Sequence, residues 1–388
     1  MNICVIGTGY VGLITGCGFA KLGHDVVCVD IDRKKVEMIN GGEPPIYEKG
    51  LEEALAEVVG KRLRATTDLK TAVKNSEIIF ITVGTPSAPD GSVGLSFVRK
   101  AFLDALEALD SYKAIVVKST VVPGSTDSLA KLGEDKLGKT AGEDYGLCMN
   151  PEFLREGKAL EDFLYPDRIV IGADDAKTIE KMMELYSSFE CPKVKVDRKT
   201  AEMIKYASNA FLATKLSFMN EIGNICKLNG MDVYAVLEGM RYDERIEGKF
   251  MNAGAGFGGS CFPKDVSGLA DHARKVGYTP IVLESVLETN KRQPLRMLEI
   301  AKKYGSLRGK KVAVLGLSFK PDTDDVREAP ALRLVEGLLK DGARVIVYDP
   351  KAMENAKKVL DRNVEYAKDA KGALESADIC FIMTEWKE

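Results

Sequence analysis

The residues best suited to covalent chemistry lie in one short segment around Cys261. The run Ala-Gly-Phe-Gly-Gly-Ser-Cys-Phe-Pro-Lys-Asp, residues 255–265, places a thiol after closely spaced glycines and within four residues of a cation and a carboxylate. Glycine lets a backbone approach a bound molecule without side-chain clash, and a neighbouring lysine raises the nucleophilic thiolate fraction of a cysteine. A buried structural cysteine in a glycine-rich turn has the same local pattern. The segment alone leaves both interpretations open.

A pattern typical of dinucleotide binding opens the chain. The apolar residues 3–6 predict a buried parallel strand, and Gly7, Gly9 and Gly12 follow it as G-x-G-x-x-G. In such a loop the first glycine makes the tight turn, the second admits a pyrophosphate and the third lets helix and strand pack closely. The alternative is an α/β turn that binds nothing.

The elements after this loop favour the dinucleotide site. We expect a helix over residues 10–22 and a second strand over residues 25–29 that ends in Asp30. This acid lies 18 residues beyond Gly12, where a carboxylate binds the ribose 2′-hydroxyl of NAD. Because the carboxylate would repel a 2′-phosphate, the sequence predicts NAD rather than NADP, although the basic residues 33–35 soften that preference.

Composition predicts a cytoplasmic enzyme of two or three domains. The 388 residues carry 55 basic and 58 acidic side chains, with no basic block for nucleic acid and no long apolar run for a membrane. The first residues enter a strand directly, so we expect no signal peptide. Eight cysteines without a C-x-x-C pair predict reduced thiols, and two histidines make a metal site improbable, so none is predicted.

Alternating strand and helix patterns up to about residue 196 predict an α/β fold with an open parallel sheet. Ligands of such sheets lie beyond the carboxyl ends of the strands. Thr85, Thr120 and Glu152 each follow an expected strand. Each alone is ordinary turn or cap chemistry, but their shared location favours a common cleft.

A helical pattern without proline follows over residues 200–228 and would extend roughly 40 Å. A helix of this length predicts a bridge between domains or a dimer interface. Lys205 and Asn209 are four residues apart and lie on one face of this helix. The two residues are either a functional pair or part of a solvated surface.

A second α/β unit begins with the strand pattern of residues 311–317 and lacks G-x-G-x-x-G. The predicted fold is therefore two Rossmann-like doubly wound domains joined by a long central helix and helical region. We predict domains at residues 1–196 for NAD, 197–305 for dimerisation and the cysteine segment, and 306–388 for a second, nucleotide-like ligand.

With these motifs in place, the chain resembles the UDP-glucose 6-dehydrogenase family, within the wider UDP-glucose/GDP-mannose dehydrogenase group. The resemblance covers essentially the whole chain and rests on specific motifs at residues 7–12, 150–157, 202–211, 255–265 and 316–328. Residues 243–246 and the Phe-Pro-Lys-Asp ending of the cysteine segment are more similar to the UDP-glucose members than to the GDP-mannose or N-acetylated-sugar members.

The resemblance implies a four-electron oxidation in which two NAD⁺ are reduced as the C6 alcohol of UDP-glucose becomes the carboxylate of UDP-glucuronate. It implies that Lys205, Asn209 and Asp265 serve the first hydride transfer. Cys261 would then form a thiohemiacetal and a thioester, and Glu152 with Thr120 would direct the hydrolytic water.

The resemblance also implies two sets of binding residues. Those for NAD are Gly7, Thr8, Gly9, Tyr10, Val11, Gly12, Asp30, Lys35, Thr85, Thr120, Glu156, Lys264 and Arg327. Those for the UDP-sugar are Phe153, Leu154, Arg155, Glu156, Lys205, Asn209, Arg245, Phe250, Asn252, Gly254, Gly256, Phe257, Gly258 and Lys320. Arg245 would reach the substrate of a neighbouring subunit, which implies a homodimer or a higher homo-oligomer.

The family normally continues well beyond residues 384–386, so we expect the second nucleotide domain to lack its last strand and helix, with an edge exposed. One basic residue with which the family contacts its substrate would be missing with them. Three other functions stay open: the same chemistry on GDP-mannose or UDP-N-acetylmannosamine, a two-electron β-hydroxyacid dehydrogenase, and a nucleotide-sugar binding protein without activity.

Overall fold

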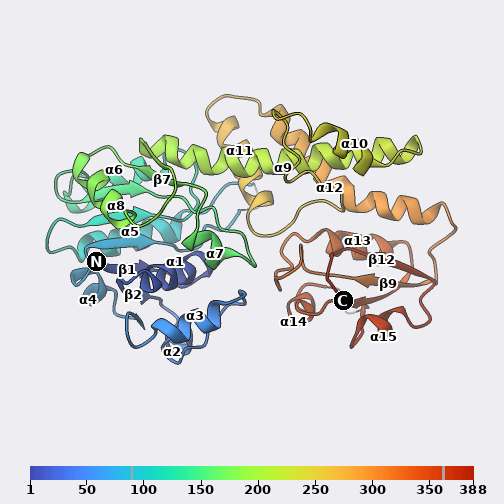
Figure 1. Cartoon of the computed structure of the whole chain (residues 1–388), viewed down its shortest axis with the longest axis horizontal. Helices are drawn as coiled ribbons and strands as arrows, with labels where there is room; N and C mark the ends of the chain where they lie inside the picture. The colour runs from blue at the N-terminus through green and yellow to red at the C-terminus, as the bar shows by residue number, and fades with distance from the viewer. Residues whose placement is uncertain (89–90, 361–362) are drawn as a thin grey trace. The chain divides into compact units, whose positions relative to one another are not determined.

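The short apolar runs of the sequence form the strands of two separate sheets. The computed structural model describes residues 1–88, 91–360 and 363–388, and it divides into two units, Met1–Ala207 and Ser208–Glu388 (Figure 1). The predicted α/β class is confirmed. The three domain boundaries drawn from the sequence stay a prediction.

The sheet of the first unit has eight strands in the order β3-β2-β1-β4-β5-β6-β7-β8. Their bounds are β1 Asn2–Ile6, β2 Asp25–Val29, β3 Leu63–Thr66, β4 Ile78–Ile81, β5 Ala114–Val117, β6 Gly146–Met149, β7 Ile169–Gly172 and β8 Lys193–Val196. The two strands predicted at residues 3–6 and 25–29 end where the sequence predicted. The order, with β1 between β2 and β4, places the glycine loop after β1 near the carboxyl end of β4.

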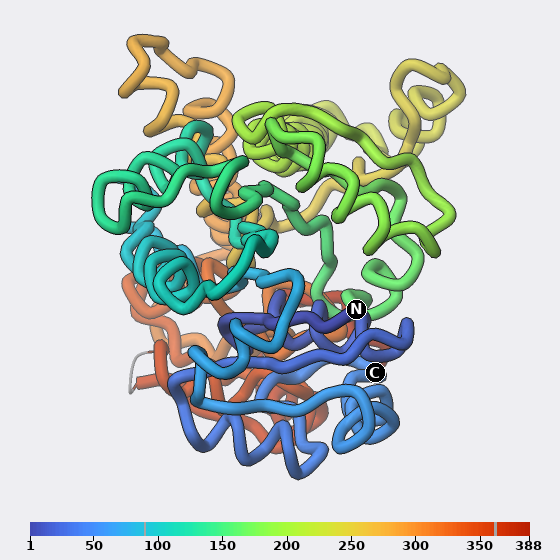
Figure 2. The backbone as a smooth tube through the Cα atoms, turned by 90° about the vertical axis from the view of Figure 1, so that its left-hand side faces the viewer, coloured from blue at the N-terminus to red at the C-terminus, as the bar shows by residue number. Residues whose placement is uncertain are grey.

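One feature of this sheet differs from the prediction of a wholly parallel sheet. β7 pairs with β6 in the antiparallel sense, and β8 follows β7 in parallel. The helix that connects them, α7 (Ala159–Leu164), packs on α1 (Tyr10–Lys21) and does not return the chain to the amino end of β6. β7 therefore begins near the carboxyl end of β6 and runs in the opposite direction. Figure 2 shows this green segment beside the dark blue N-terminal chain.

Helices cover both faces of the first sheet, because successive strand residues point to opposite faces. Ile3 and Val5 of β1 belong to the core beneath α1, α3, α7 and α8, whereas Cys4 and Ile6 belong to the core beneath α4, α5 and α6. The remaining bounds are α2 Arg33–Asn40, α3 Leu51–Val58, α4 Leu69–Lys74, α5 Ser96–Glu107, α6 Ser125–Leu137 and α8 Ala176–Leu185.

The long helix α9 (Arg198–Leu228) has 31 residues and is continuous in Figure 1, where it runs from green to yellow. The boundary between the two units falls within it. The second unit continues with α10 Val233–Met240, α11 Phe262–Lys275 and α12 Ile281–Lys302. Ala210 and Ala213 of α9 pack there with Phe257, Val266 and Val286.

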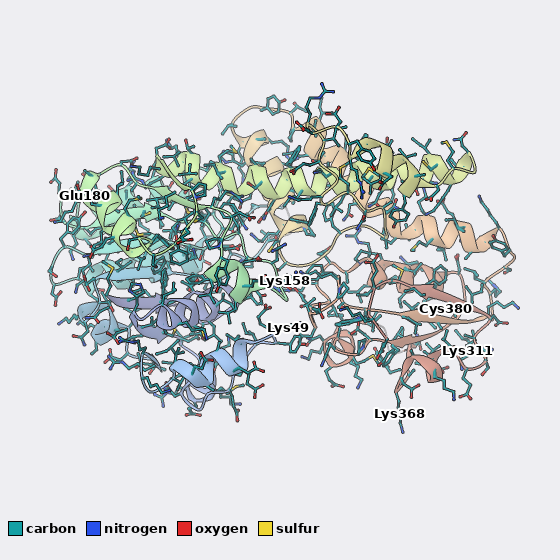
Figure 3. All side chains as sticks on the ribbon, in the orientation of Figure 1. Lys49, Lys158, Glu180, Lys311, Lys368 and Cys380 are labelled. Carbon is teal, nitrogen blue, oxygen red and sulfur yellow. The ribbon has the colours of Figure 1, made fainter. Side chains whose placement is uncertain are left out.

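The second unit has its own parallel sheet in the order β11-β10-β9-β12. The bounds are β9 Lys311–Leu315, α13 Pro330–Lys340, β10 Arg344–Tyr348, α14 Met353–Ala356, β11 Glu365–Tyr366, α15 Ala370–Leu374 and β12 Ile379–Ile382. In the described residues β12 is an edge strand, and its Cys380 is exposed (Figure 3).

Candidate functional site

The loop after β1 has the geometry that its glycines predict. Gly7 has a φ of +98°, and a Cβ on Gly12 would lie 1.9 Å from the carbonyl oxygen of Gly7. Only glycine lets α1 start this close to β1. At Gly9 a Cβ would meet nothing within 4 Å, so this side of the loop is open within the described structure. The loop therefore fits a dinucleotide pyrophosphate.

Asp30 lies at the end of β2 and is hydrogen-bonded to the same loop. Its Oδ2 accepts from the backbone N–H of Thr8 at 2.8 Å and from the Thr8 hydroxyl at 2.5 Å, and its Oδ1 accepts from the Asp32 N–H at 3.0 Å. Burial would raise the pKa of Asp30, but these hydrogen bonds and the charge of Lys35 hold it below its usual value. Asp30 is therefore a carboxylate beside the glycine loop.

Glu152 and Lys205 form a buried ion pair. The Lys205 ammonium donates to Glu152 Oε1 at 2.8 Å, and Glu152 Oε2 accepts from the Leu154 N–H at 2.6 Å. The side chains are 3% and 6% exposed. Burial would raise the pKa of Glu152, but the charge of Lys205 and these hydrogen bonds hold it below its usual value. The site thus keeps a carboxylate away from bulk water.

Thr85, Thr120 and Glu152 follow β4, β5 and β6, which are neighbouring parallel strands. Their positions therefore share one edge of the sheet, as the sequence predicted. Glu156 is partly buried in the segment that follows β6.

Phe153 and Arg155 have contacts that the sequence did not indicate. The guanidinium of Arg168 lies 3.8 Å from the centroid of the Phe153 ring, and the Lys205 ammonium lies 5.5 Å from it. Arg155 pairs with Asp162 at 2.5 Å and is mostly exposed. Two cationic groups thus lie close to the Phe153 ring, whose face attracts positive charge.

Glu48 is a buried carboxylate that sequence reasoning missed. It accepts from the Tyr10 hydroxyl at the start of α1, from the Gly157 N–H at 2.7 Å and from the Ala159 N–H at 2.8 Å. It therefore connects the glycine loop with the segment after Glu152. Its sequence neighbours, prolines and a glycine, predict only a solvated loop, so no local signal marked it.

The cysteine segment lies in the second unit, at the start of α11. Cys261 is the N-cap residue and is partly exposed, and its Sγ lies 3.6 Å from the Ser260 hydroxyl. A helix N-terminus stabilises negative charge on a nearby group. Asp265, 1% exposed, accepts from Asn209 Nδ2 at 2.6 Å and from Lys264 Nζ at 2.7 Å. Lys264, predicted to activate the thiol, is thus bound to Asp265.

Two glycines of this segment are needed for close packing within the protein. A Cβ on Gly258 would lie 2.5 Å from the Glu328 carbonyl oxygen, and one on Gly259 would lie 2.8 Å from the Phe319 ring. The Gly259 N–H also donates to the Arg327 carbonyl at 2.8 Å. The segment therefore packs against residues that follow β9, which is a reason for these glycines that the sequence alone did not suggest.

Amide side chains hold the part of the segment that precedes Cys261. Asn220 Oδ1 accepts from the Gly254 N–H at 2.7 Å, and Gln293 Nε2 donates to the Gly254 carbonyl at 2.8 Å. Asn290 both accepts from and donates to the backbone of Phe257, at 2.7 and 2.9 Å. Sequence reasoning missed these residues. The available signal was that Asn290 and Gln293 are three residues apart on α12 and therefore share one face of that helix.

The remaining predicted residues of the second unit are more exposed. Arg245 pairs with Asp243 and Arg327 with Asp325, both at 2.6 Å, and their side chains are 88% and 64% exposed. The Lys320 ammonium lies 5.6 Å from the Phe319 ring centroid. Phe250 has a φ of +63°, which is unusual for a residue with a side chain. These residues are spread over several loops of the second unit.

Three models of known families match successive parts of the chain. They describe the NAD binding domain, the central domain and the UDP binding domain of the UDP-glucose/GDP-mannose dehydrogenase family, and they match residues 1–190, 199–292 and 313–388. The chain belongs to this family. The resemblance inferred from the motifs is therefore confirmed, and so is the predicted cofactor, NAD.

Individual members of the family are similar to the chain over its whole length. UDP-glucose 6-dehydrogenase TuaD of Bacillus subtilis is 45% identical over 389 residues, which cover 100% of this chain and 84% of the relative. UDP-glucose 6-dehydrogenase AglM of Haloferax volcanii is 44% identical over 397 residues, with 100% and 92% covered. A solved UDP-glucose dehydrogenase from Pyrobaculum islandicum has a TM-score of 0.95 and 42% identity, and the match covers 99% of this chain and 90% of that one.

No helix among the described residues is long and apolar enough to cross a membrane. None of the described cysteines is part of a disulfide. The site residues fall into two sets: Glu152 with Lys205 and the glycine loop in the first unit, and Cys261 with Asp265 and Asn209 in the second. Each set is assembled from parts of the chain far apart in sequence.

Proposed function

We propose that the protein oxidises C6 of UDP-glucose to the carboxylate of UDP-glucuronate and reduces two NAD⁺ in the process. The observation that carries the proposal is the buried Glu152–Lys205 pair, together with a partly exposed Cys261 beside the Asn209–Asp265–Lys264 group. The similarity to UDP-glucose 6-dehydrogenases over the whole chain supports the same reaction.

In the first oxidation the C6 hydroxyl loses a proton and C6 loses a hydride, which bound NAD⁺ accepts by its own chemistry. We assign Lys205 to stabilise the developing alkoxide, because its ammonium is buried and oriented by Glu152. Asn209 lies one turn further along α9 and is oriented by Asp265. Asp265, which is paired with Lys264, supports proton removal.

In the second oxidation the Cys261 thiolate adds to the aldehyde carbon and gives a thiohemiacetal. Transfer of the C6 hydride to a second NAD⁺, with loss of the hydroxyl proton, gives a thioester. Water then attacks this thioester, Glu152 accepts a proton from the water, and the thiolate leaves as the carboxylate forms. Thr120, at the same edge of the sheet as Glu152, helps to orient the water. Glu152 is suited to this step because it is ionised and buried.

The glycine loop and Asp30 bind NAD in this proposal, with Lys35, Thr85 and Glu156 nearby in the same unit. The open position at Gly9 and the ionised acid at the end of β2 suit the pyrophosphate and the ribose. Lys264 and Arg327 are further proposed contacts of NAD. The segment around Phe153, the glycines before Cys261 and Lys320 bind the UDP-sugar.

We also propose that the protein is a cytoplasmic homodimer or a higher homo-oligomer. Phe211, Phe218 and Ile225 of α9 are spaced by seven residues, and their side chains are 65%, 50% and 46% exposed. Such a stripe on one helix face fits a second copy of the same helix. Arg245, which is 88% exposed, is then available to a substrate on the neighbouring subunit. The described cysteines form no disulfide, which fits a reducing compartment.

The yield of NADH per sugar tests the proposed reaction. We expect two NADH for each UDP-glucose consumed, with UDP-glucuronate as the product. A two-electron dehydrogenase would give one, and a binding protein none. A panel of UDP-glucose, GDP-mannose and UDP-N-acetylmannosamine identifies the sugar, and faster turnover of either alternative would overturn the assignment to UDP-glucose.

A further inference from the structure

Lys118 is a buried lysine to which the proposed reaction assigns no role. It directly follows the last residue of β5, and it is 5% exposed. Its ammonium donates to Asn150 Oδ1 at 3.0 Å and approaches the Asn150 carbonyl oxygen at 3.5 Å. Lysine is almost never this deeply buried without a partner. Both of these acceptors belong to Asn150, which lies two positions before Glu152.

Asn150 makes further hydrogen bonds through both atoms of its side-chain amide. Its Oδ1 also accepts from the Tyr186 hydroxyl at 2.6 Å, and its Nδ2 donates to the Val170 carbonyl at 2.7 Å. These contacts come from three different elements of the first unit. Lys118 and Tyr186 therefore fix the start of the segment that carries Glu152.

The charge of Lys118 also interacts with both members of the buried ion pair, Glu152 and Lys205. The charged groups that act on Glu152 are Lys205 from α9 and Lys118 from the end of β5. Those that act on Lys118 are Glu152, the Cys148 thiol of β6 and Lys205. Burial lowers the pKa of Lys118 to about 8, so it is mostly charged at neutral pH, and burial raises the pKa of Cys148 to about 12, so that thiol is neutral. Glu152 is thus balanced by two cations.

We propose that Lys118 is a positioning residue for Glu152, which holds Asn150 in place and supplies the second buried positive charge that keeps Glu152 ionised. The inference rests on the proposed role of Glu152 as the base that activates water. A buried ammonium is unfavourable compared with an apolar side chain of similar shape. If packing were its only contribution, a methionine would serve the same position at least as well.

Lys118→Met tests the proposal, and Lys113→Met is its matched control. Lys113 precedes β5 at the opposite end of the same strand, is 7% exposed, and donates to the carbonyls of Lys74 and Ser76 at 2.6 and 2.8 Å. Loss of a nearby opposite charge raises the pKa of a carboxyl by on the order of one unit. In Lys118→Met we expect the acid limb of the pH profile for thioester hydrolysis to move upward by that amount. In Lys113→Met it should not move.

A second measurement follows Glu152 without catalysis. The infrared band of its protonated carboxyl is identified by its loss in Glu152→Gln, and its titration should move upward in Lys118→Met and stay unchanged in Lys113→Met. Lys118→Gln keeps a hydrogen-bond donor for Asn150 without the charge, and it should show the same shift if Lys118→Met fails to fold.

Unchanged titration of Glu152 in a folded Lys118 variant would overturn the proposal, even if activity falls, because that outcome makes Lys118 a structural residue. The proposed function is tested separately. If the unmodified protein does not reduce NAD⁺ with UDP-glucose, that assignment is wrong, whereas the infrared titration still reports whether Lys118 controls the ionisation of Glu152.

Discussion

The ammonium of Lys205 lies 2.8 Å from a carboxylate oxygen of Glu152, although 53 residues separate the two in sequence. α9 carries the lysine and the segment after β6 carries the acid. Because the pair is buried, neither charge is screened by water, and the charge of Lys205 helps to hold the pKa of Glu152 below its usual value. A change at one residue is therefore expected to alter the chemistry of both.

Replacement of Lys205 by methionine should lower kcat by on the order of 10²-fold or more, which is a usual effect of removing a group that acts in proton transfer or charge stabilisation. It also leaves the Glu152 charge buried with one cation fewer. The matched control is Lys199→Met, because Lys199 lies on the same helix with a side chain that is 64% exposed. Stopped-flow NADH formation measures both variants, and a normal kcat in Lys205→Met would leave the ion pair as a purely structural feature.

Asp30→Ala should relax the preference for NAD over NADP. The variant removes the carboxylate that we propose to face the ribose 2′-position, and a hydrogen bond to a charged group contributes about 1.5–3 kcal/mol. We expect NAD to bind on the order of tenfold or more weakly, while NADP binding improves. Asp25→Ala is the control, since Asp25 begins the same strand and pairs with Arg62. Equal use of NAD and NADP by the unmodified protein would show that Asp30 has been assigned wrongly.

Cys261→Ser should fold and bind NAD, but it should lose the oxidation of aldehyde to acid. A serine hydroxyl is a weak nucleophile without an adjacent base, so the covalent step fails. Mass spectrometry should detect any sugar ester that forms slowly on the serine. Cys380→Ser is the control, because Cys380 is exposed on β12 (Figure 3). Turnover of Cys261→Ser to the uronic acid at close to the normal rate would exclude a covalent mechanism.

Glu202 should make the stability of the first unit depend on pH. It is fully buried on α9 and accepts from the N–H groups of Gly124 and Thr126 at the start of α6. Burial raises its pKa to about 7 from a usual value of 4.5. The folded state then binds the proton more tightly, so a contribution present below pH 4.5 is lost as pH rises through 7, up to about 3 kcal/mol.

Urea unfolding at pH 5 to 8 measures this contribution against Glu202→Gln. The stability advantage of the unmodified protein over Glu202→Gln should fall as pH rises. Glu180→Gln, at an exposed position on α8 (Figure 3), should give a difference that does not vary with pH in this range. A constant difference for Glu202→Gln would mean that Glu202 is ionised throughout.

Phe218→Glu should separate the subunits if α9 forms the proposed interface. A charge in the middle of the exposed stripe is unfavourable against an apolar partner surface. Analytical ultracentrifugation should show the monomer mass for this variant. Tyr304→Glu, at an 88% exposed position after α12, should keep the mass of the unmodified protein. A Phe218→Glu protein of unchanged oligomeric mass would place the interface elsewhere.

Local sequence patterns were sufficient for several features of this protein. Glycine spacing predicted the turn at Gly7 and the close packing at Gly12, because both depend on residues that adjoin in the chain. Apolar runs predicted the strands, and the distance from the loop made Asp30 a candidate for the ribose. Cys261 became a candidate because a thiol that follows closely spaced glycines is visible in one short segment, and its role stays a prediction.

Other features depended on the tertiary structure. No local pattern pairs Glu152 with Lys205 or Asn209 with Asp265, because each pair forms only when helix α9 packs against another part of its unit. The reversed direction of β7 follows from the packing of α7 on α1. The ionisation of Glu152, Lys118 and Glu202 also depends on burial and on charges that folding brings near. The sequence by itself determined which groups are available for chemistry, whereas the tertiary structure decided their neighbours and charge states, since electrostatic interactions depend on distance in space and exposure to water.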